Sequence, residues 1–368
     1  MRRVLGLGLI AAVVLATGAA IAAGAGVATG YIYWGNYGSN SEGTTIGRAS
    51  VGGSAANQRF ISTGVGGPVG VVSNGQYLYW SNTLTEHNTG TNIGRANLNG
   101  SGVNGAFIST AVGPHGLALD AHHIYWANRG QDGTGTTIGR ANLDGTGVND
   151  NFITGGQGPW GVAINGSYIF WTNRGTAGGS PCGGSIGRAN IDGSAANQSL
   201  IPGVNGPTGI AVAGPYVYWA NGCADTIGRA NLDGTGVNQS FITGASDPSG
   251  VTVAGGYIYW GNFAAPNSNG GGTTIGRARI DGSGVNQTFL KGASSPTGIA
   301  VSVATSCTVP KVVGKSLAAA KRAIVAGGCS VGSVSRRHGR HSGRVLAQRP
   351  KPGTSEPTGA AVSLVVAR

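Results

Sequence analysis

The sequence predicts an all-β fold, a six-bladed β-propeller closed by its C-terminal strand, followed by a small α+β domain. A unit of roughly 45 residues recurs six times between Tyr31 and Ala304. Each unit contains only short apolar and β-branched runs, which is typical of a radial array of small sheets. The array begins inside one unit and ends inside another, so its last segment must complete the first sheet. That closure leaves no end blade with an unpaired edge.

Three markers define the unit: an aromatic-Trp pair, an Ile-Gly-Arg triplet and a Pro-x-Gly corner. They begin at Tyr33, Tyr79, Tyr125, Phe170, Tyr218 and Tyr259, at Ile46, Ile93, Ile138, Ile186, Ile227 and Ile275, and at Pro68, Pro114, Pro159, Pro207, Pro248 and Pro296. The isoleucine lies 20 residues before the residue that precedes the proline, or 21 in the first unit, whereas the Trp-to-Ile spacing varies from 8 to 15. One side of each unit is therefore fixed in length, and the other side carries variable loops.

Each unit supplies four strands. Strand A follows the Pro-x-Gly corner, as in residues 209–212, strand B is the aromatic-Trp run, strand C begins at Ile-Gly-Arg, and strand D is a run such as 241–243. Asp-Gly or Asn-Gly pairs between C and D indicate tight hairpins, because glycine accepts a positive φ. For Asp144, Asp192, Asp233 and Asp281 we therefore favour a role in the turn.

The succession Tyr-Trp-x-Asn, Ile-Gly-Arg-Ala-Asn-Leu-Asp-Gly and Pro-x-Gly-Ile-Ala-Val resembles the YWTD propellers of low-density lipoprotein receptors and their bacterial relatives. The resemblance covers residues 31–303 and implies the six-bladed fold. The chain departs from the family at the fourth motif position, where asparagine replaces aspartate. These asparagines are Asn36, Asn82, Asn128, Asn173, Asn221 and Asn262. The resemblance therefore does not imply that this chain binds ligands through acidic groups at this position, as the family does.

The two ends differ from the repeats. Residues 1–25 combine two arginines, an apolar run and small residues, the pattern of a cleaved signal peptide, although a retained membrane helix is the alternative. We assign residues 26–303 to the propeller, 304–306 to a linker and 307–368 to the tail domain. In the tail, Ser316 is a candidate N-cap, Leu317, Ala320 and Ile324 line one helical face, and Gly327 ends the helix.

The tail resembles a single PASTA domain, the wall-associated module of bacterial penicillin-binding proteins and serine/threonine kinases. The resemblance rests on the Val-Pro-x-Val-x-Gly start, the helix, and the Gly-Arg-Val-x-x-Gln-x-Pro-x-Pro-Gly run. It implies a bacterial, secreted or extracytoplasmic protein that associates with the cell wall.

Charge separates the two domains. Residues 26–305 hold 11 basic and 11 acidic side chains, whereas residues 306–368 hold 11 basic side chains and only Glu356. A basic tail favours polyanions, which in a bacterial wall are peptidoglycan or anionic wall polymers. A solvated surface that merely aids solubility is the alternative. We expect no nucleic-acid partner, because neither a recognition helix nor an aromatic-basic platform is apparent. We expect a monomer.

Four cysteines in an exported chain suggest two disulfides. Cys307 and Cys329 flank the first strand and the helix of the tail, so we expect them to pair. Cys182 and Cys223 lie in B-to-C loops of adjacent blades, which makes a second pair. The alternative, a metal site, would need further ligands that neither loop provides.

The positions that break the repeat are the candidate binding residues, because the D-to-A corners and B-to-C loops surround one mouth of the channel. The corner residues after the prolines are Val69, His115, Trp160, Thr208, Ser249 and Thr297. Trp160 could stack on a sugar ring or a peptide aromatic, with His115 as a hydrogen-bonding neighbour. The alternative is that both cap the channel. We include Thr208, Ser249 and Thr297 as further binding candidates.

Catalysis needs convergent titratable groups, and the propeller has few. We therefore predict a non-enzymatic, secreted binding protein whose propeller takes an unknown glycan, peptide or protein, with no cofactor and no metal site. The alternative is a propeller enzyme of the lactonase or streptogramin-lyase type acting at the central channel. His115 is the evident catalytic candidate for that alternative.

Overall fold

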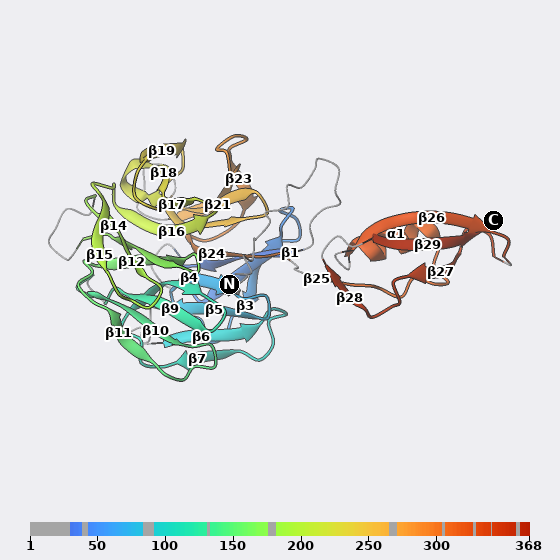
Figure 1. Ribbon diagram of the computed structural model, residues 1–368, viewed down its shortest axis with the longest axis horizontal. Helices are drawn as coiled ribbons and strands as arrows, with labels where there is room; N and C mark the ends of the chain where they lie inside the picture. Colours follow the sequence, from blue (N-terminus) through green and yellow to red (C-terminus); the bar gives the residue numbers. More distant parts are fainter. Residues whose placement is uncertain are drawn as a thin grey trace, which may run out of the picture.

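The computed structural model confirms the six-bladed propeller and its small α+β appendage (Figure 1). It describes residues 30–38, 43–83, 92–130, 133–175, 182–264, 271–303, 306–326, 329–339, 341–357 and 361–368. The predicted signal peptide, residues 1–25, lies outside the described residues.

Six four-stranded antiparallel sheets form the blades. Blade 1 consists of β24 (Pro296–Val303), β1 (Gly30–Asn36), β2 (Thr45–Ser50) and β3 (Asn57–Ile61). Blade 2 consists of β4 (Pro68–Ser73), β5 (Tyr77–Asn82), β6 (Asn92–Asn97) and β7 (Asn104–Ile108), and blade 3 of β8 (Pro114–Leu119), β9 (His123–Asn128), β10 (Thr137–Asn142) and β11 (Asn149–Ile153). Blade 4 consists of β12 (Pro159–Ile164), β13 (Tyr168–Asn173), β14 (Ser185–Asn190) and β15 (Asn197–Pro202). Blade 5 consists of β16 (Pro207–Ala213), β17 (Tyr216–Asn221), β18 (Thr226–Asn231) and β19 (Asn238–Thr243), and blade 6 of β20 (Pro248–Ala254), β21 (Tyr257–Ala264), β22 (Gly271–Arg279) and β23 (Asn286–Lys291).

The ring closes as predicted. The last propeller strand, β24, pairs antiparallel with the first, β1, with Val301 opposite Ile32 and Ile299 opposite Trp34. The inner strands β4, β8, β12, β16, β20 and β24 contact one another in succession, and β24 contacts β4 to complete the circle. Chain segments from the two ends of the repeat array thus build one sheet.

The blade tryptophans form the core between sheets. All six are fully buried, and each lies opposite the glycine of the Ile-Gly-Arg triplet, as Trp219 lies opposite Gly228. A Cβ atom at Gly228 would lie 2.3 Å from the Trp219 ring. The glycine is therefore required because the indole occupies the space that any side chain would need.

The repeated asparagines clamp the corner of each blade. Asn173 is 2% exposed. Its Oδ1 accepts a hydrogen bond from the Gln157 N–H at 3.0 Å, and its Nδ2 donates to the Gln198 carbonyl at 2.8 Å. The position needs a donor and an acceptor at once, and an ionised carboxylate can only accept. This requirement accounts for asparagine in place of the aspartate of YWTD repeats.

The repeated arginines hold aromatic side chains in place. The Arg229 guanidinium carbon lies 4.4 Å from the centroid of the Tyr216 ring and 4.0 Å from that of Phe241. The same type of contact, a cation–π interaction, recurs in all six blades. The contacts indicate a structural role for these arginines.

A glutamine on strand D links neighbouring blades. In blade 4, Gln198 Oε1 accepts a hydrogen bond from Trp171 Nε1 at 3.0 Å, and Gln198 Nε2 donates to the Thr154 carbonyl of blade 3 at 2.7 Å. Asp150 replaces this glutamine in blade 3. There, Trp126 Nε1 and Asp150 Oδ1 are buried and make no hydrogen bond of good geometry. Burial raises the pKa of Asp150, against the opposing effect of the nearby Trp126 and Asn128 side chains.

Replacing Asp150 by glutamine is therefore expected to stabilise the propeller by about 1 kcal/mol, the typical net contribution of a restored hydrogen bond. The amide would give Trp126 an acceptor and would give the neighbouring blade a donor. Chemical denaturation followed by tryptophan fluorescence measures the change. The reciprocal substitution Gln198→Asp is the matched control and should destabilise; equal stability of Asp150→Gln and the parent chain would contradict the prediction.

The tail forms its own core. Helix α1 (Leu317–Ala326) packs with β26 (Ser330–Arg337), β27 (Val345–Arg349) and β29 (Ala361–Ala367), while β25 (Ser306–Thr308) pairs with β28 (Ser355–Pro357). The Ser316 hydroxyl accepts a hydrogen bond from the Ala319 N–H at 3.3 Å, as an N-cap does, and Ala320 and Ile324 are fully buried. The predicted stop at Gly327 lies outside the described residues.

Candidate functional site

The D-to-A corners and B-to-C loops share one rim of the propeller, as the sequence predicts. In blade 4, the first loop residue, Arg174, donates its backbone N–H to the carbonyl of Gly158, the residue before the corner proline, at 3.3 Å. The equivalent bond recurs in the other five blades, from Tyr37, Thr83, Arg129, Gly222 and Phe263. A cavity of about 390 Å³ opens between the inner strands at this rim. Its volume is in the range of small-molecule sites.

All five predicted binding residues, His115, Trp160, Thr208, Ser249 and Thr297, line this cavity. Three of them have hydroxyl groups that are already hydrogen-bonded to the main chain. Thr208 donates to the Pro248 carbonyl at 2.8 Å, Ser249 donates to the Pro296 carbonyl at 2.6 Å, and Thr297 donates to the Pro68 carbonyl. Each bond joins one blade to the next. A ligand role for these three residues stays a prediction, and their geometry favours holding the ring together.

His115 and Trp160 lie together, as the sequence predicts. The ring centroids are 4.8 Å apart, and the planes meet at 75°, an edge-on contact. His115 Nδ1 lies 3.1 Å from the Gly113 carbonyl oxygen, so Nδ1 carries the proton and donates it. Burial, followed by the positive charge of Arg129, lowers the pKa of His115 to about 3. His115 is therefore a neutral side chain at physiological pH.

Two arginines that the sequence analysis did not single out cover Trp160. The guanidinium carbons of Arg129 and Arg174 lie 4.5 Å and 4.6 Å from the Trp160 ring centroid. Burial lowers the pKa of Arg129 to about 10, with the charge of Arg174 acting in the same direction. Both groups are still cations at neutral pH. The site is thus an aromatic ring with two guanidinium cations in contact with it.

Asp247 is the third residue that sequence reasoning missed. It occupies the position before the corner proline, where four blades have glycine with φ between +52° and +59°, at Gly67, Gly113, Gly158 and Gly206. Asp247 has a φ of +42°. Left-handed backbone is uncommon for residues other than glycine. Backbone strain of this kind is concentrated at functional sites.

The Asp247 side chain lines the same cavity as Arg174. Burial raises the pKa of its carboxyl group, against the opposing effect of the Arg174 charge. A residue-by-residue comparison of the six repeats shows that these residues differ from their counterparts in other blades. At the position after the repeated asparagine, blades 3 and 4 have arginine, and at the position before the corner proline, blade 6 has aspartate.

In the part of the chain that the structure describes, no three His, Cys, Asp or Glu side chains cluster as metal ligands would. Among the same residues, no helix has the length and apolar character needed to cross a bilayer.

Comparison with known proteins separates the two domains. Residues 308–368 match the PASTA domain family. The tail is a PASTA domain. None of the curated protein sequences compared with the chain matches it.

The chain was also compared with solved structures. It is similar to a chain in the crystal structure of a nidogen/laminin complex, with a TM-score of 0.57 at 18% sequence identity, over 75% of this chain and 98% of that chain. At this identity the likeness shows the fold alone, in agreement with the propeller described above. A gluconolactonase from Xanthomonas campestris gives a TM-score of 0.45 at 18% identity, over 62% of this chain and 76% of that chain, which is too weak a likeness to carry a functional argument.

The PASTA domain presents its basic side chains to solvent. All ten that the structure describes are exposed: Lys311, Lys315, Lys321, Arg322, Arg336, Arg337, Arg344, Arg349, Lys351 and Arg368. They surround an apolar core that includes Val312, Ile324 and Val362. Cys329 is buried and disulfide-bonded, whereas the side chain of its predicted partner, Cys307, lies outside the described residues.

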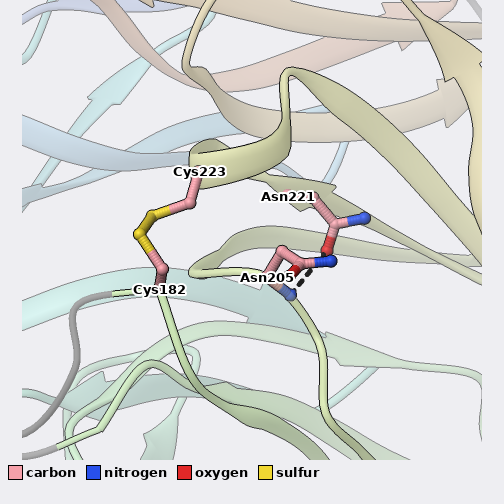
Figure 2. The surroundings of a disulfide bond; sticks show 4 residues. All are labelled: Cys182, Asn205, Asn221 and Cys223. Atoms are coloured by element: carbon pink, nitrogen blue, oxygen red, sulfur yellow. Dashed lines mark hydrogen bonds between the residues drawn. A yellow bond between two sulfur atoms is a disulfide. The ribbon is translucent and has the colours of Figure 1, made fainter.

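The predicted disulfide between Cys182 and Cys223 is present (Figure 2). Cys223 lies in a short 3-10 turn, η1 (Gly222–Ala224), and Cys182 lies in the B-to-C loop of blade 4. The bond therefore links two neighbouring rim loops. Beside it, the Asn205 N–H donates to Asn221 Oδ1 at 3.3 Å, which is the corner clamp of blade 5.

Proposed function

We propose that this protein is a secreted, cell-wall-associated binding protein. Its PASTA domain associates with peptidoglycan, and its propeller binds a ligand at the rim cavity. The observation that carries the proposal is the PASTA domain at residues 308–368, joined to a propeller whose rim holds an Arg-Trp-Arg cluster. The disulfide between Cys182 and Cys223 fits an oxidising, extracytoplasmic compartment.

Electrostatics support association with the wall. Residues 306–368 carry 11 basic side chains and one acidic side chain. A surface of this kind attracts the polyanions of a bacterial envelope, and the attraction weakens as salt increases. Specific recognition by the PASTA fold and charge attraction by its basic side chains are therefore separable, because only the second depends strongly on anionic wall polymers.

The rim cavity favours binding over acid–base chemistry. A general base works best with a pKa near the operating pH, and the pKa of His115 is lowered to about 3. The two arginines over Trp160 are fixed cations that recognise a ligand without exchanging protons.

Sedimentation with insoluble peptidoglycan at physiological salt tests the wall proposal. The chain from residue 26 to 368 is expected to co-sediment, while the chain from 26 to 303, which lacks the PASTA domain, stays in the supernatant. Peptidoglycan with and without its anionic polymers separates the two kinds of attraction. Equal behaviour of the long and short chains on both preparations would remove the proposal.

A further inference from the structure

The mouth of the cavity carries fixed charges of both signs that are not paired with each other. Arg174 and Asp247 both line the cavity, and each influences the pKa of the other through its charge. Among the described residues, however, no ion pair within 4.0 Å joins them. No described residue donates a hydrogen bond to the Asp247 carboxylate either. Both groups therefore keep their capacity to bind something else.

The positive side is arranged for a planar anion. Arg129 and Arg174 place their guanidinium groups over Trp160, and stacking leaves the N–H edges of a guanidinium available. Arg174 lines the cavity, whereas Arg129 is not part of its lining and contributes a second positive charge against Trp160. A carboxylate accepts two parallel N–H bonds from a guanidinium, so it matches this edge.

The negative group, the Asp247 carboxylate, has an unfavourable backbone conformation and an unfavourable buried environment. Asp247 adopts a positive φ at a position where four other blades use glycine, and burial disfavours its charged form. Ser295, which also departs from glycine at this position, uses its hydroxyl to accept a hydrogen bond from the Gly271 N–H. Among the residues that the structure describes, none donates a comparable hydrogen bond to the Asp247 carboxylate. An ammonium group on a ligand would satisfy the carboxylate.

The rest of the cavity sets the size and character of the ligand. Its walls include apolar side chains of the inner strands, such as Val71, Leu117 and Ile210, and its rim includes the Tyr37 and Phe263 rings, whose centroids are 5.9 Å apart. A volume of about 390 Å³ accommodates a few residues of peptide but not a folded partner.

We propose that the rim cavity binds a short zwitterionic peptide, with its carboxylate on Arg174 and its ammonium on Asp247. This inference rests on the proposed binding function and narrows its ligand. A neutral sugar is disfavoured, because the Trp160 ring that would stack on it is already covered by guanidinium groups. Wall peptides that carry free carboxylates and amines have the required chemistry.

Calorimetric titration of the chain 26–368 with blocked and unblocked dipeptides tests the proposal. The probes are alanyl-alanine, its N-acetyl form, its C-terminal amide and the neutral disaccharide diacetylchitobiose. The unblocked dipeptide is expected to bind at least tenfold more tightly than either blocked form, and the disaccharide is expected not to bind. Equal affinity for the three dipeptides, preference for the disaccharide, or no binding of any dipeptide would overturn it.

Two substitutions assign the charges, and both use residues that another blade already carries at the same position. Arg174→Thr copies Thr83, and Asp247→Gly copies Gly206. Arg174→Thr should abolish the preference for the unblocked dipeptide over its C-terminal amide. Asp247→Gly should abolish the preference for the unblocked dipeptide over its N-acetyl form. Arg59→Thr, which removes an exposed charge on the outer strand β3, is the control and should change nothing. Sedimentation with peptidoglycan is measured on the parent chain and on the same variants. A parent chain that is retained by peptidoglycan but binds no dipeptide would refute this inference and leave the proposed wall association standing.

Discussion

Replacing Gly228 by alanine is expected to destabilise the propeller by about 3 kcal/mol, at the upper end of the usual cost of overpacking a core. The added methyl would lie 2.3 Å from Trp219 Cε2 and 2.5 Å from Cζ2. Trp219 has no exposed surface, and strand pairing holds Gly228 directly opposite it. Neither the ring nor the backbone can move without disturbing two packed sheets.

Urea denaturation of the chain 26–303 measures this loss as a lowered midpoint with an unchanged slope. Gly52→Ala is the matched control, because the nearest atom to its new Cβ would be 3.8 Å away, and its φ lies outside the left-handed region. That control should stay within about 0.5 kcal/mol of the parent, as surface substitutions usually do. A Gly228→Ala chain as stable as the control would show that the Trp-Gly contact is not needed.

Ending the chain before β24 is expected to have a still larger effect, the loss of cooperative folding. Without residues 296–303, blade 1 keeps only β1, β2 and β3, and the ladder from Ile32 and Trp34 to Val301 and Ile299 disappears. The inner strands β4 and β20 would lose the neighbour that joins them. Both sides of the gap would then expose unpaired backbone and apolar surface.

Chains 26–303 and 26–295 provide the comparison, by near-ultraviolet circular dichroism and gel filtration. The longer chain should give a monomeric, cooperatively unfolding propeller, and the shorter chain should aggregate or lack fixed aromatic signals. Placing residues 296–303 ahead of β1, through a three-residue turn like 74–76 of blade 2, should restore folding because blade 1 then follows the strand order of the others. Normal folding of the 26–295 chain would mean that closure is dispensable.

Much of the architecture could be predicted because each repeat contains strands that pair with their neighbours along the chain. The fixed spacing from Ile-Gly-Arg to the corner proline covers strands C and D, which pair with a residue register that is the same in every blade, as at Arg188 opposite Asn197 and Arg229 opposite Asn238. The bond between Cys182 and Cys223 followed from the same geometry, since B-to-C loops of adjacent blades lie on one rim. Strand order and closure needed no further information.

The candidate site was predictable only in part. His115 and Trp160 stand out because they break the corner pattern, and the structure places them in contact. Thr208 and Ser249 were further candidates at the same corner position, yet their hydroxyls donate to carbonyls of the next blade. Nothing in one blade's sequence says where the next blade's carbonyl will lie. The contact depends on the angle between sheets.

The sequence by itself determined the number of blades, the strand order, the closure at β24 and the PASTA domain, because each depends on segments that repeat or on a motif read along the chain. Tertiary structure alone decided that Arg129 and Arg174 cover Trp160 and that Asp247 shares a cavity with Arg174. These residues come from blades 3, 4 and 6 and from loops of unequal length. The curvature of the closed ring brings these residues together, and the repeat pattern of the sequence does not predict that they meet.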